Sequence, residues 1–273
     1  MTKRPALDAL ITLALDAGRE IMAVREEGFD PSHKLDGSIV TIADQRAEAL
    51  IEAVLEKLAP GVPMLGEEAV AAGRVPERSD RFFCVDPLDG TRGFAKGGDE
   101  FTVNIALIEN AEPVMGVVFA PATGELYAGE PGRALSARYA LKTFAPLAPP
   151  KAITITGAPS KPWRIVASDF SGRNERTGDF VKALGGVTTH ASSSIKFCRV
   201  AEGAADLYPR FGDVSEWDTA AAHAVLNAAG GGVMTLSGAP LHYGTKKGDF
   251  IVPGFVAFGS EAAAKAARTA LGV

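Results

Sequence analysis

Residues 82–108 read FFCVDPLDGTRGFAKGGDEFTVNIALI, an apolar run that leads directly into two aspartates and is followed by a second apolar run. The segment FFCV has no polar residue, as expected of a strand covered on both faces, so Asp86 and Asp89 emerge where that strand ends. Open α/β sheets commonly place ligands beyond such strand ends. We therefore expect a sheet with a functional site at this point.

Two carboxylates this close together in the sequence are expected to need a compensating positive charge. Asp-Pro-Leu-Asp-Gly also fits a simple turn, but two carboxylates about 4 Å apart repel by roughly 1 kcal/mol in water and roughly 4 kcal/mol at an effective dielectric of 20. A divalent cation reverses that sign, because Mg²⁺ prefers oxygen donors. Pro87 and Gly90 would fix the bend so that the carbonyl of Leu88 also faces the metal. The backbone N–H groups of Gly90 and Thr91 suit a phosphate, so the pattern indicates phosphoryl chemistry.

The composition excludes several classes of protein. A chain of 273 residues with 47% hydrophobic residues can form one large domain or two packed subdomains. The net charge of −5, without a basic block, argues against a nucleic-acid polymer as partner. No apolar segment is long enough to span a membrane, and MTKRPALDAL lacks a signal-peptide core. We expect a cytoplasmic protein and leave peripheral membrane association and a homodimer open. Cys84 and Cys198 are expected to be reduced, largely buried thiols.

The first half of the chain has an α+β pattern. Apolar spacing predicts helices over residues 5–27 and 42–58. Strands are expected over residues 81–85, 101–108, 114–120 and 125–128. Only ENAEP separates the second strand from the third, so we expect a hairpin and a mixed or antiparallel sheet.

The second half has an α/β pattern. The proline-rich segment KTFAPLAPP, residues 142–150, predicts a boundary between subdomains at 1–145 and 150–273. Beyond it, strands over 153–156, 164–167, 232–236 and 255–258 alternate with helices over 174–184, 195–202, 216–229 and 261–271. Three glycines at 230–232 follow a helix and indicate its end.

Two further acids join the candidate site, Glu67 in MLGEEAV and Asp218 in SEWDTAAAH. Ser215-x-x-Asp218 also fits the capping-box pattern at a helix start, and so does Thr41-x-x-Asp44. A helix cap and a role in the site therefore both stay open for Asp218, and the pattern by itself gives Asp44 only the cap.

The ordered motifs of this chain resemble those of the inositol monophosphatase superfamily of Mg²⁺-dependent, typically lithium-sensitive phosphatases. They are GEE at 66–68, DPLDGT at 86–91 and EWDTAAAHAVLNAAGG at 216–231. Within that superfamily, GGDEFTVNIALIE and SSSIKFCRVAEGAADLYPRFG are most similar to CysQ-type 3′(2′),5′-bisphosphate nucleotidases of sulfur metabolism. The resemblance covers most of the chain and implies a layered αβαβα sandwich. One departure is Gly93, where related sequences often have an acid.

The resemblance also implies roles for individual residues. Two or three Mg²⁺ ions would be held by a set of five residues: Glu67, Asp86, Leu88 through its carbonyl, Asp89 and Asp218. Thr91, hydrogen-bonded to Asp44, would orient and help deprotonate the attacking water together with Glu67. No covalent intermediate is implied.

The substrate implied is a small phosphate ester, adenosine 3′,5′-bisphosphate, which would lose its 3′-phosphate. The substrate-binding residues expected are Glu67, Asp89, Gly90, Thr91, Arg92, Lys196 and Asp218. Lys196, Arg92 and Arg210 are the candidates for a second anion site, and a solvated position on a helix is the alternative for Lys196. Inositol monophosphate, histidinol phosphate and fructose 1,6-bisphosphate remain alternative substrates, and a non-catalytic phosphate sensor is a third hypothesis.

Overall fold

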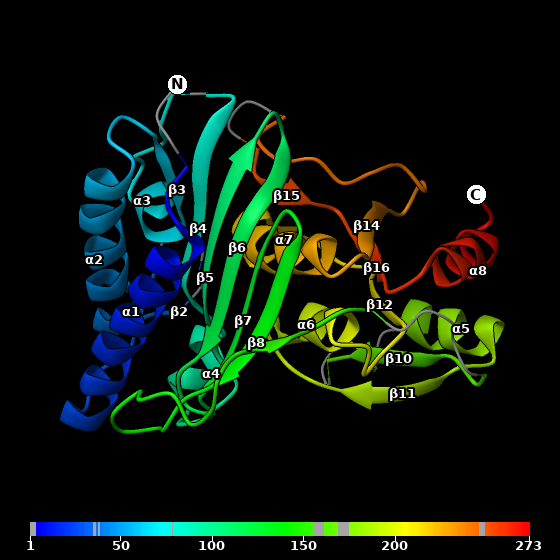
Figure 1. The fold of residues 1–273 in the computed structure, drawn as a ribbon, viewed down its shortest axis with the longest axis horizontal. Coiled ribbons are helices and arrows are strands. Elements are labelled where there is room, and N and C mark those ends of the chain that lie inside the picture. The colour runs from blue at the N-terminus through cyan, green and yellow to red at the C-terminus, as the bar shows by residue number, and fades with distance from the viewer. Residues whose placement is uncertain are drawn as a thin grey trace.

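Two long helices cover one face of a seven-stranded sheet in the first half of the chain (Figure 1). This computed structural model describes residues 4–34, 37, 39–77, 79–155, 161–168, 175–245 and 249–273. The helices are α1 (Leu7–Glu27) and α2 (Ile42–Leu58), with the short α3 (Glu67–Ala71) and α4 (Thr91–Phe94). The strands in sheet order are β3 (Met64–Gly66), β4 (Arg81–Asp89), β5 (Thr102–Glu109), β6 (Glu112–Ala120), β7 (Glu125–Glu130), β8 (Arg133–Arg138) and β9 (Lys151–Ala152). Among the described residues of this sheet, β3 and β4 form the one parallel pair, and β5 and β6 form the expected hairpin.

A mixed five-stranded sheet dominates the second half. Its strands in sheet order are β11 (Val187–His190), β10 (Arg164–Ala167), β12 (Leu207–Arg210), β16 (Phe255–Phe258) and β14 (Gly232–Thr235). One face carries α6 (Ile195–Ala201) and α7 (Ala220–Ala228), and the other carries α5 (Glu175–Leu184) and α8 (Glu261–Leu271). The 3₁₀ turn η2 (Glu216–Asp218) leads into α7. Two small ribbons pair β1 (Ser32–His33) with β2 (Ile39–Val40) and β13 (Val214–Ser215) with β15 (Ile251–Val252).

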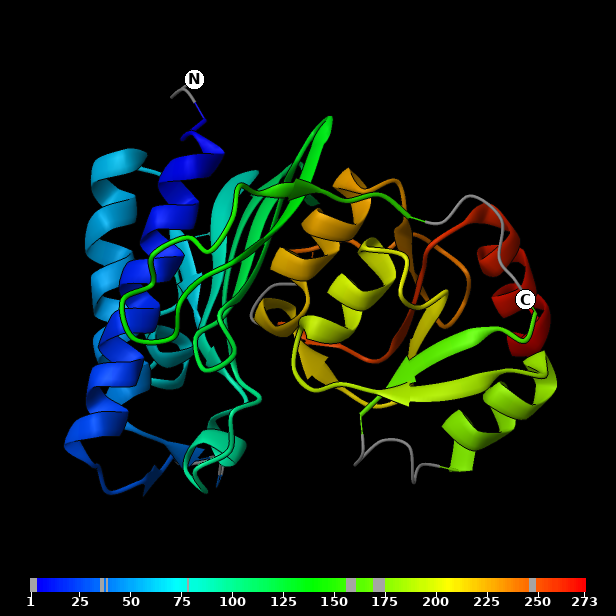
Figure 2. The same ribbon diagram turned by 60° about the horizontal axis from the view of Figure 1, so that its bottom comes forward.

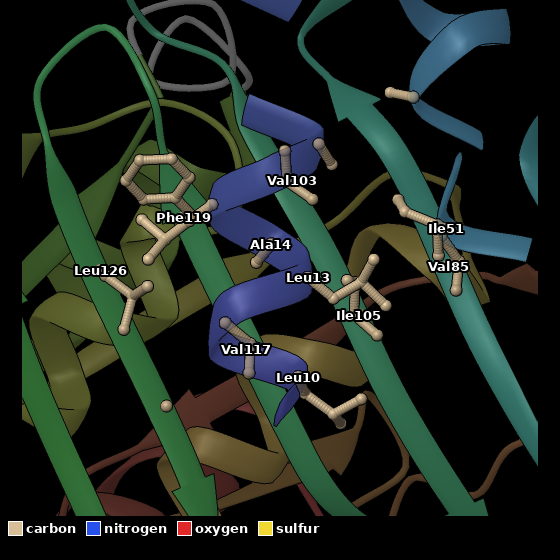
Figure 3. Packing of buried hydrophobic residues seen from close by; sticks show 14 of the residues in the cluster. Leu10, Leu13, Ala14, Ile51, Val85, Val103, Ile105, Val117, Phe119 and Leu126 are labelled. Carbon is tan, nitrogen blue, oxygen red and sulfur yellow. The ribbon is translucent and has the colours of Figure 1, made fainter. Parts of the chain in front are cut away.

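Three hydrophobic cores join these elements into five layers. The first core lies between α1, α2 and the seven-stranded sheet, where Val103 and Ile105 point toward α1 (Figure 3). The second lies around α6 and α7 and combines residues of both halves, such as Cys84 and Val225. The third lies beneath α5 and α8. Figure 2 shows the same succession of helices and sheets from another direction. The expected layered αβαβα sandwich is confirmed.

Two glycines let α7 approach the seven-stranded sheet closely. A Cβ atom on Gly116 of β6 would lie 2.1 Å from the carbonyl oxygen of Ala221, and one on Gly129 of β7 would lie 2.7 Å from the Cα of Val225. Carbon atoms in contact prefer about 3.5–4.0 Å, so a side chain at either glycine would push the helix outward. Because η2 precedes α7, this contact sets how deeply Asp218 lies between the sheets.

The helices and strands predicted for the first half lie close to their expected bounds, but β3, β8, α3 and α4 were not predicted, nor was β12 in the second half. Other departures also lie in the second half. The helix expected over 216–229 is interrupted, because η2 ends at Asp218 and α7 begins at Ala220. The strand expected over 153–156 is wrong: residues 153–155 are irregular, and Thr156 lies outside the described residues. Asn174, the expected start of a helix, also lies outside them. The edge strand β11 was not predicted because VTTH is exposed along its length and has no apolar alternation.

Two further expectations concern the whole chain. Cys84 and Cys198 are buried and free, as predicted. The division into 1–145 and 150–273 stays a prediction, although α6 and α7 of the second part pack directly on the sheet of the first. Across the described ranges, no helix has the length and apolar character needed to cross a membrane.

Candidate active site

Strand β4 brings two aspartates to one point between the sheets. Val85 faces the first core, so its neighbour Asp86 faces the opposite side of the sheet, where it is 1% exposed (Figure 3). Strict alternation would send Asp89 back to the first side. The pairing with β5 instead shifts register between Asp86 and Asp89, and such an irregularity re-aims the residues that follow. Both carboxylates therefore lie at the same point.

The third aspartate comes from the second half of the chain. One carboxylate oxygen each of Asp86, Asp89 and Asp218 lies within 4.8 Å of the other two. The backbone N–H of Ser215 donates to Oδ2 of Asp218 at 2.8 Å, so the capping box read from the sequence is present. That cap holds the carboxylate toward β4. The structure thus brings together three of the acids expected to hold metal.

Burial raises the pKa of all three aspartates, and repulsion by neighbouring carboxylates adds to the shift of Asp86 and Asp218. Burial raises the pKa of Asp218 to about 8, with Asp89 as the next cause. Burial also raises the pKa of Asp86 well above its usual range, reinforced by Glu67 and Asp89. Carboxylates that share a low-dielectric site cannot all ionise unless a cation compensates them. Since the donors are all hard oxygen atoms, the group suits Mg²⁺ or a similar cation.

Glu67 lies beside this group but is held by a lysine. It is the first residue of α3, directly after β3, and its Oε1 accepts a hydrogen bond from Lys34 Nζ at 2.6 Å. The same ammonium lies 2.7 Å from Oε1 of Glu68. Burial alone would lower the pKa of Lys34, but the two carboxylates raise it. Glu67 is therefore not part of the three-aspartate group, although it acts on the Asp86 carboxylate electrostatically.

Thr91 and Asp44 form the hydrogen bond expected from the family resemblance. Thr91 Oγ1 donates to Asp44 Oδ1 at 2.9 Å and also lies 2.9 Å from the carbonyl oxygen of Leu88. The other oxygen of Asp44 accepts from the backbone N–H and the hydroxyl of Thr41, at 2.8 and 2.7 Å. One buried carboxylate thus caps α2 and contacts Thr91, so the two readings of Asp44 are compatible. Leu88 directs its carbonyl at Thr91 in this structure.

Gly90 connects the strand to α4 through a backbone that other residues adopt only with strain. Its φ is +102°, and a Cβ atom there would lie 2.8 Å from the carbonyl oxygen of Glu100. A side chain would therefore clash as well as strain the turn. The turn starts α4 with Thr91, so glycine here sets the direction in which the first backbone amides of α4 point.

A cavity of about 410 Å³ opens beside the aspartates. Its lining includes residues expected to bind substrate: Asp89, Gly90, Lys196, Arg210 and Asp218. The solvated alternative for Lys196 is wrong, because the side chain is 5% exposed. Burial lowers the pKa of Lys196 to about 8, and Asp89 opposes that shift.

The contacts of the cationic residues differ. Lys196 Nζ donates to the carbonyl of Ser193 at 2.7 Å and lies 5.2 Å from the centre of the Tyr208 ring. The guanidinium of Arg210 donates to backbone carbonyls in its own loop. Arg92 is exposed and does not line the cavity. Two other residues expected to bind substrate, Glu67 and Thr91, are also absent from its lining.

Sequence reasoning missed two residues that shape the site, Lys34 and Glu48. Glu48 is 2% exposed, and its carboxylate accepts the backbone N–H groups of Glu68 and Ala69 at 2.8 and 2.6 Å. It therefore anchors the start of α3, which carries Glu67. A signal for Glu48 was available, because it follows Ala47 and lies one turn after Asp44 on the buried side of α2. Lys34 belongs to a turn-rich loop whose composition gives no such signal.

Comparison with known proteins agrees with this geometry. A model of the inositol monophosphatase family matches residues 2–270. The 3′(2′),5′-bisphosphate nucleotidase CysQ of Escherichia coli K12 is 41% identical over 252 residues, which cover 91% of this chain and 98% of the relative. The crystal structure of CysQ from Bacteroides thetaiotaomicron has a TM-score of 0.75 at 36% identity and covers 93% of this chain and 96% of that one.

A more distant structure shares the fold. The inositol monophosphatase from Anabaena (Nostoc) sp. PCC 7120 has a TM-score of 0.71 at 24% identity, with 98% of this chain and 95% of that one covered. The family model and the relatives each span nearly the whole chain. This chain belongs to the inositol monophosphatase family.

Proposed function

We propose that this protein is a Mg²⁺-dependent phosphatase that removes the 3′-phosphate from adenosine 3′,5′-bisphosphate. The observation that carries the proposal is the convergence of Asp86, Asp89 and Asp218 next to a cavity that also holds a buried lysine. The 41% identity to CysQ of Escherichia coli, a 3′(2′),5′-bisphosphate nucleotidase, supports the choice of substrate.

The donor set fits two magnesium ions. Asp86, Asp89, Asp218 and Glu67 contribute four negative charges, which two Mg²⁺ ions would balance before a phosphate enters. Asp86 would be among the residues that hold them. Lys34 engages Oε1 of Glu67, so Oε2 is the oxygen through which Glu67 would hold metal. When bound, Mg²⁺ activates water as a nucleophile and stabilises charge on the leaving oxygen.

The protein's own residues position the water and the phosphate. Asp44 accepts a hydrogen bond from the Thr91 hydroxyl, which leaves a lone pair of Thr91 Oγ1 free to accept a hydrogen bond from the attacking water. As the water attacks, its proton would pass to Thr91 Oγ1 while the Thr91 proton passes to Asp44 Oδ1. The carboxylate of Asp44 stays fixed during this step because Thr41 holds its other oxygen. The backbone amides of Gly90 and Thr91 would bind the oxygens of the transferred phosphoryl group.

The second phosphate distinguishes this substrate from simple monoesters. Lys196 and Arg210 line the same cavity as Asp89 and Asp218. The aspartates would hold the metal, and the two cationic side chains would bind a second phosphate. With a pKa of about 8, Lys196 is mostly protonated at neutral pH. A charged hydrogen bond from such a buried ammonium contributes about 1.5–3 kcal/mol. A bisphosphate gains that energy, whereas a neutral sugar or imidazole group in the same place does not.

Parallel phosphate-release assays test the proposal. The substrates are adenosine 3′,5′-bisphosphate, inositol 1-phosphate, histidinol phosphate and fructose 1,6-bisphosphate, each with Mg²⁺. We expect the nucleotide to be preferred by at least about tenfold in kcat/KM, which corresponds to about 1.4 kcal/mol of transition-state stabilisation. A preference for another ester would reject the substrate, and no Mg²⁺-dependent release from any of them would reject the phosphatase itself.

A further inference from the structure

The seven-stranded sheet contains a buried amide, Asn104, directly beside the aspartate group. Asn104 lies on β5 and pairs across the strands with Asp86, so the two side chains emerge on the same face of the sheet. The side chain of Asn104 is fully buried. Farther along the same face, β5 carries Ala106 and Ile108, which belong to the second hydrophobic core. On this face of β5, the side chains therefore change from apolar to polar at the position beside the carboxylates.

The amide group of Asn104 has no hydrogen-bond partner with good geometry among the described residues. This holds for both its Nδ2 and its Oδ1. Nearly all buried polar side chains in folded proteins are hydrogen-bonded, and an unpaired one destabilises the fold. An apolar residue, as at Ala106, would be more stable at this position if packing were its only role. A buried amide without a well-aligned hydrogen bond thus indicates a role other than packing.

The neighbouring carboxylates indicate what the amide is for. Asp86 Oδ1 is already held by the N–H of Leu88 at 2.9 Å, and Asp89 Oδ2 by the hydroxyl of Ser194 at 3.2 Å. Burial raises the pKa of Asp89, and a hydrogen-bonding interaction with the Asn104 side chain is among the contacts that oppose this shift, so the amide lies next to that carboxylate. Side chains that hydrogen-bond to metal ligands orient them, and their loss typically weakens metal binding 10- to 100-fold.

We propose that Asn104 is a positioning residue of the metal centre, which donates its Nδ2 hydrogens to the Asp89 carboxylate when that carboxylate holds a divalent cation. The amide oxygen remains to accept a hydrogen bond from water, which Mg²⁺ usually keeps among its ligands. The inference rests on the proposed function, because it assumes that the aspartates hold Mg²⁺. Asn104 itself would not contact the metal or the substrate.

Asn104→Leu tests this role, because leucine has the same branched shape without polar atoms. In EDTA, we expect its melting temperature to equal or exceed that of the wild type, since an unpaired buried amide is removed. In a Mg²⁺ titration followed by calorimetry, we expect the affinity to fall about 10- to 100-fold. A purely structural residue would give the reverse: a lower melting temperature and unchanged affinity. Asn104→Ala, which cannot overpack the site, carries the same affinity test if the leucine variant fails to fold.

Ile108→Val is the matched control. Ile108 lies on the same face of β5, is fully buried and belongs to the second hydrophobic core, away from the aspartates. We expect Ile108→Val to leave Mg²⁺ affinity unchanged. An equal loss of affinity in both variants would assign the effect to repacking of β5 and overturn the inference, as would wild-type affinity in the Asn104 variants. If the wild-type protein does not bind Mg²⁺, the proposed function fails instead.

Discussion

Replacing Asp218 with asparagine should stabilise the metal-free protein and remove its response to Mg²⁺. In the unfolded chain this carboxyl ionises near pH 3.8, whereas burial and Asp89 raise its pKa in the folded protein to about 8. The folded state therefore keeps a proton that the unfolded state releases between these two values. The free energy of unfolding consequently falls as the pH rises from about 4 to 8.

The magnitude follows from the shift. The pH of 7 lies about 3.2 units above the pKa of this carboxyl in the unfolded chain, and each unit corresponds to 1.36 kcal/mol. Keeping the carboxyl protonated in the folded state therefore lowers the free energy of unfolding by about 4 kcal/mol at pH 7. Asp86 and Asp89 share protons with Asp218, so we expect asparagine to recover about 2–4 kcal/mol. Its side-chain oxygen can still accept the N–H of Ser215. At about 2 °C per kcal/mol for a chain of this size, the melting temperature should rise by about 4–8 °C.

Thermal unfolding in EDTA at pH 4.5 and pH 7, with and without millimolar Mg²⁺, provides the assay. Asp218→Asn should raise the melting temperature strongly at pH 7 and only slightly at pH 4.5. In this variant, Mg²⁺ should no longer raise the melting temperature. Asp179→Asn, on the exposed side of α5, is the control and should change neither quantity. An Asp218→Asn protein that is no more stable than the wild type at pH 7, or whose gain is the same at both pH values, would refute the reasoning.

Four further predictions concern the same site. Asp89→Asn should lower turnover by more than about 100-fold with an unchanged far-UV circular dichroism spectrum, and a fully active variant would contradict the metal assignment. Mg²⁺ at about 100 times its Kd should stabilise the wild type by about 2.7 kcal/mol, measured as a rise in melting temperature over an EDTA-treated sample; identical melting curves would count against binding. Glu48→Ala should lower the free energy of unfolding, measured by chemical denaturation, by about 1–3 kcal/mol, because the N–H groups of Glu68 and Ala69 lose their acceptor. It should also reduce kcat. A loss of stability with full kcat would show that the position of α3 does not affect catalysis. Lys196→Met should lower kcat/KM for adenosine 3′,5′-bisphosphate about 10- to 100-fold and leave adenosine 3′-monophosphate nearly unaffected; equal losses on both substrates would remove Lys196 from the second phosphate site.

The parts of the site that lie close together in the sequence were the most predictable. The apolar strand, the two aspartates at its end and the glycine after them form one continuous segment, and alternation along β4 gives the direction of Asp86 once the strand is recognised. The direction of Asp89 depends on the register shift with β5, which alternation does not predict. The hydrogen bond between Thr91 and Asp44 required the family resemblance, because 47 residues separate the two positions.

The features that the sequence did not predict depend on contacts between distant segments. Lys34 pairs with Glu67 across 33 residues, and nothing in the loop around Lys34 marks it as a partner of the acid. The helix expected over 216–229 is interrupted because Glu216 turns to accept the N–H of Gly244 and Asp218 caps the turn. Asn104 looked like one polar residue in an apolar strand, and only its pairing with Asp86 reveals its position.

The close contact of α7 with Gly116 and Gly129 has a consequence for how this protein tolerates change. A methyl group at either glycine would push α7 away from the sheet and so displace Asp218, which precedes the helix. Activity would therefore fall although neither glycine lines the cavity. A saturation-mutagenesis screen scored by activity should therefore reject alanine at these two positions in the middle of a sheet as strongly as it rejects changes to the aspartates. The two glycines on the face of the sheet would then be as intolerant of substitution as the aspartates at its end.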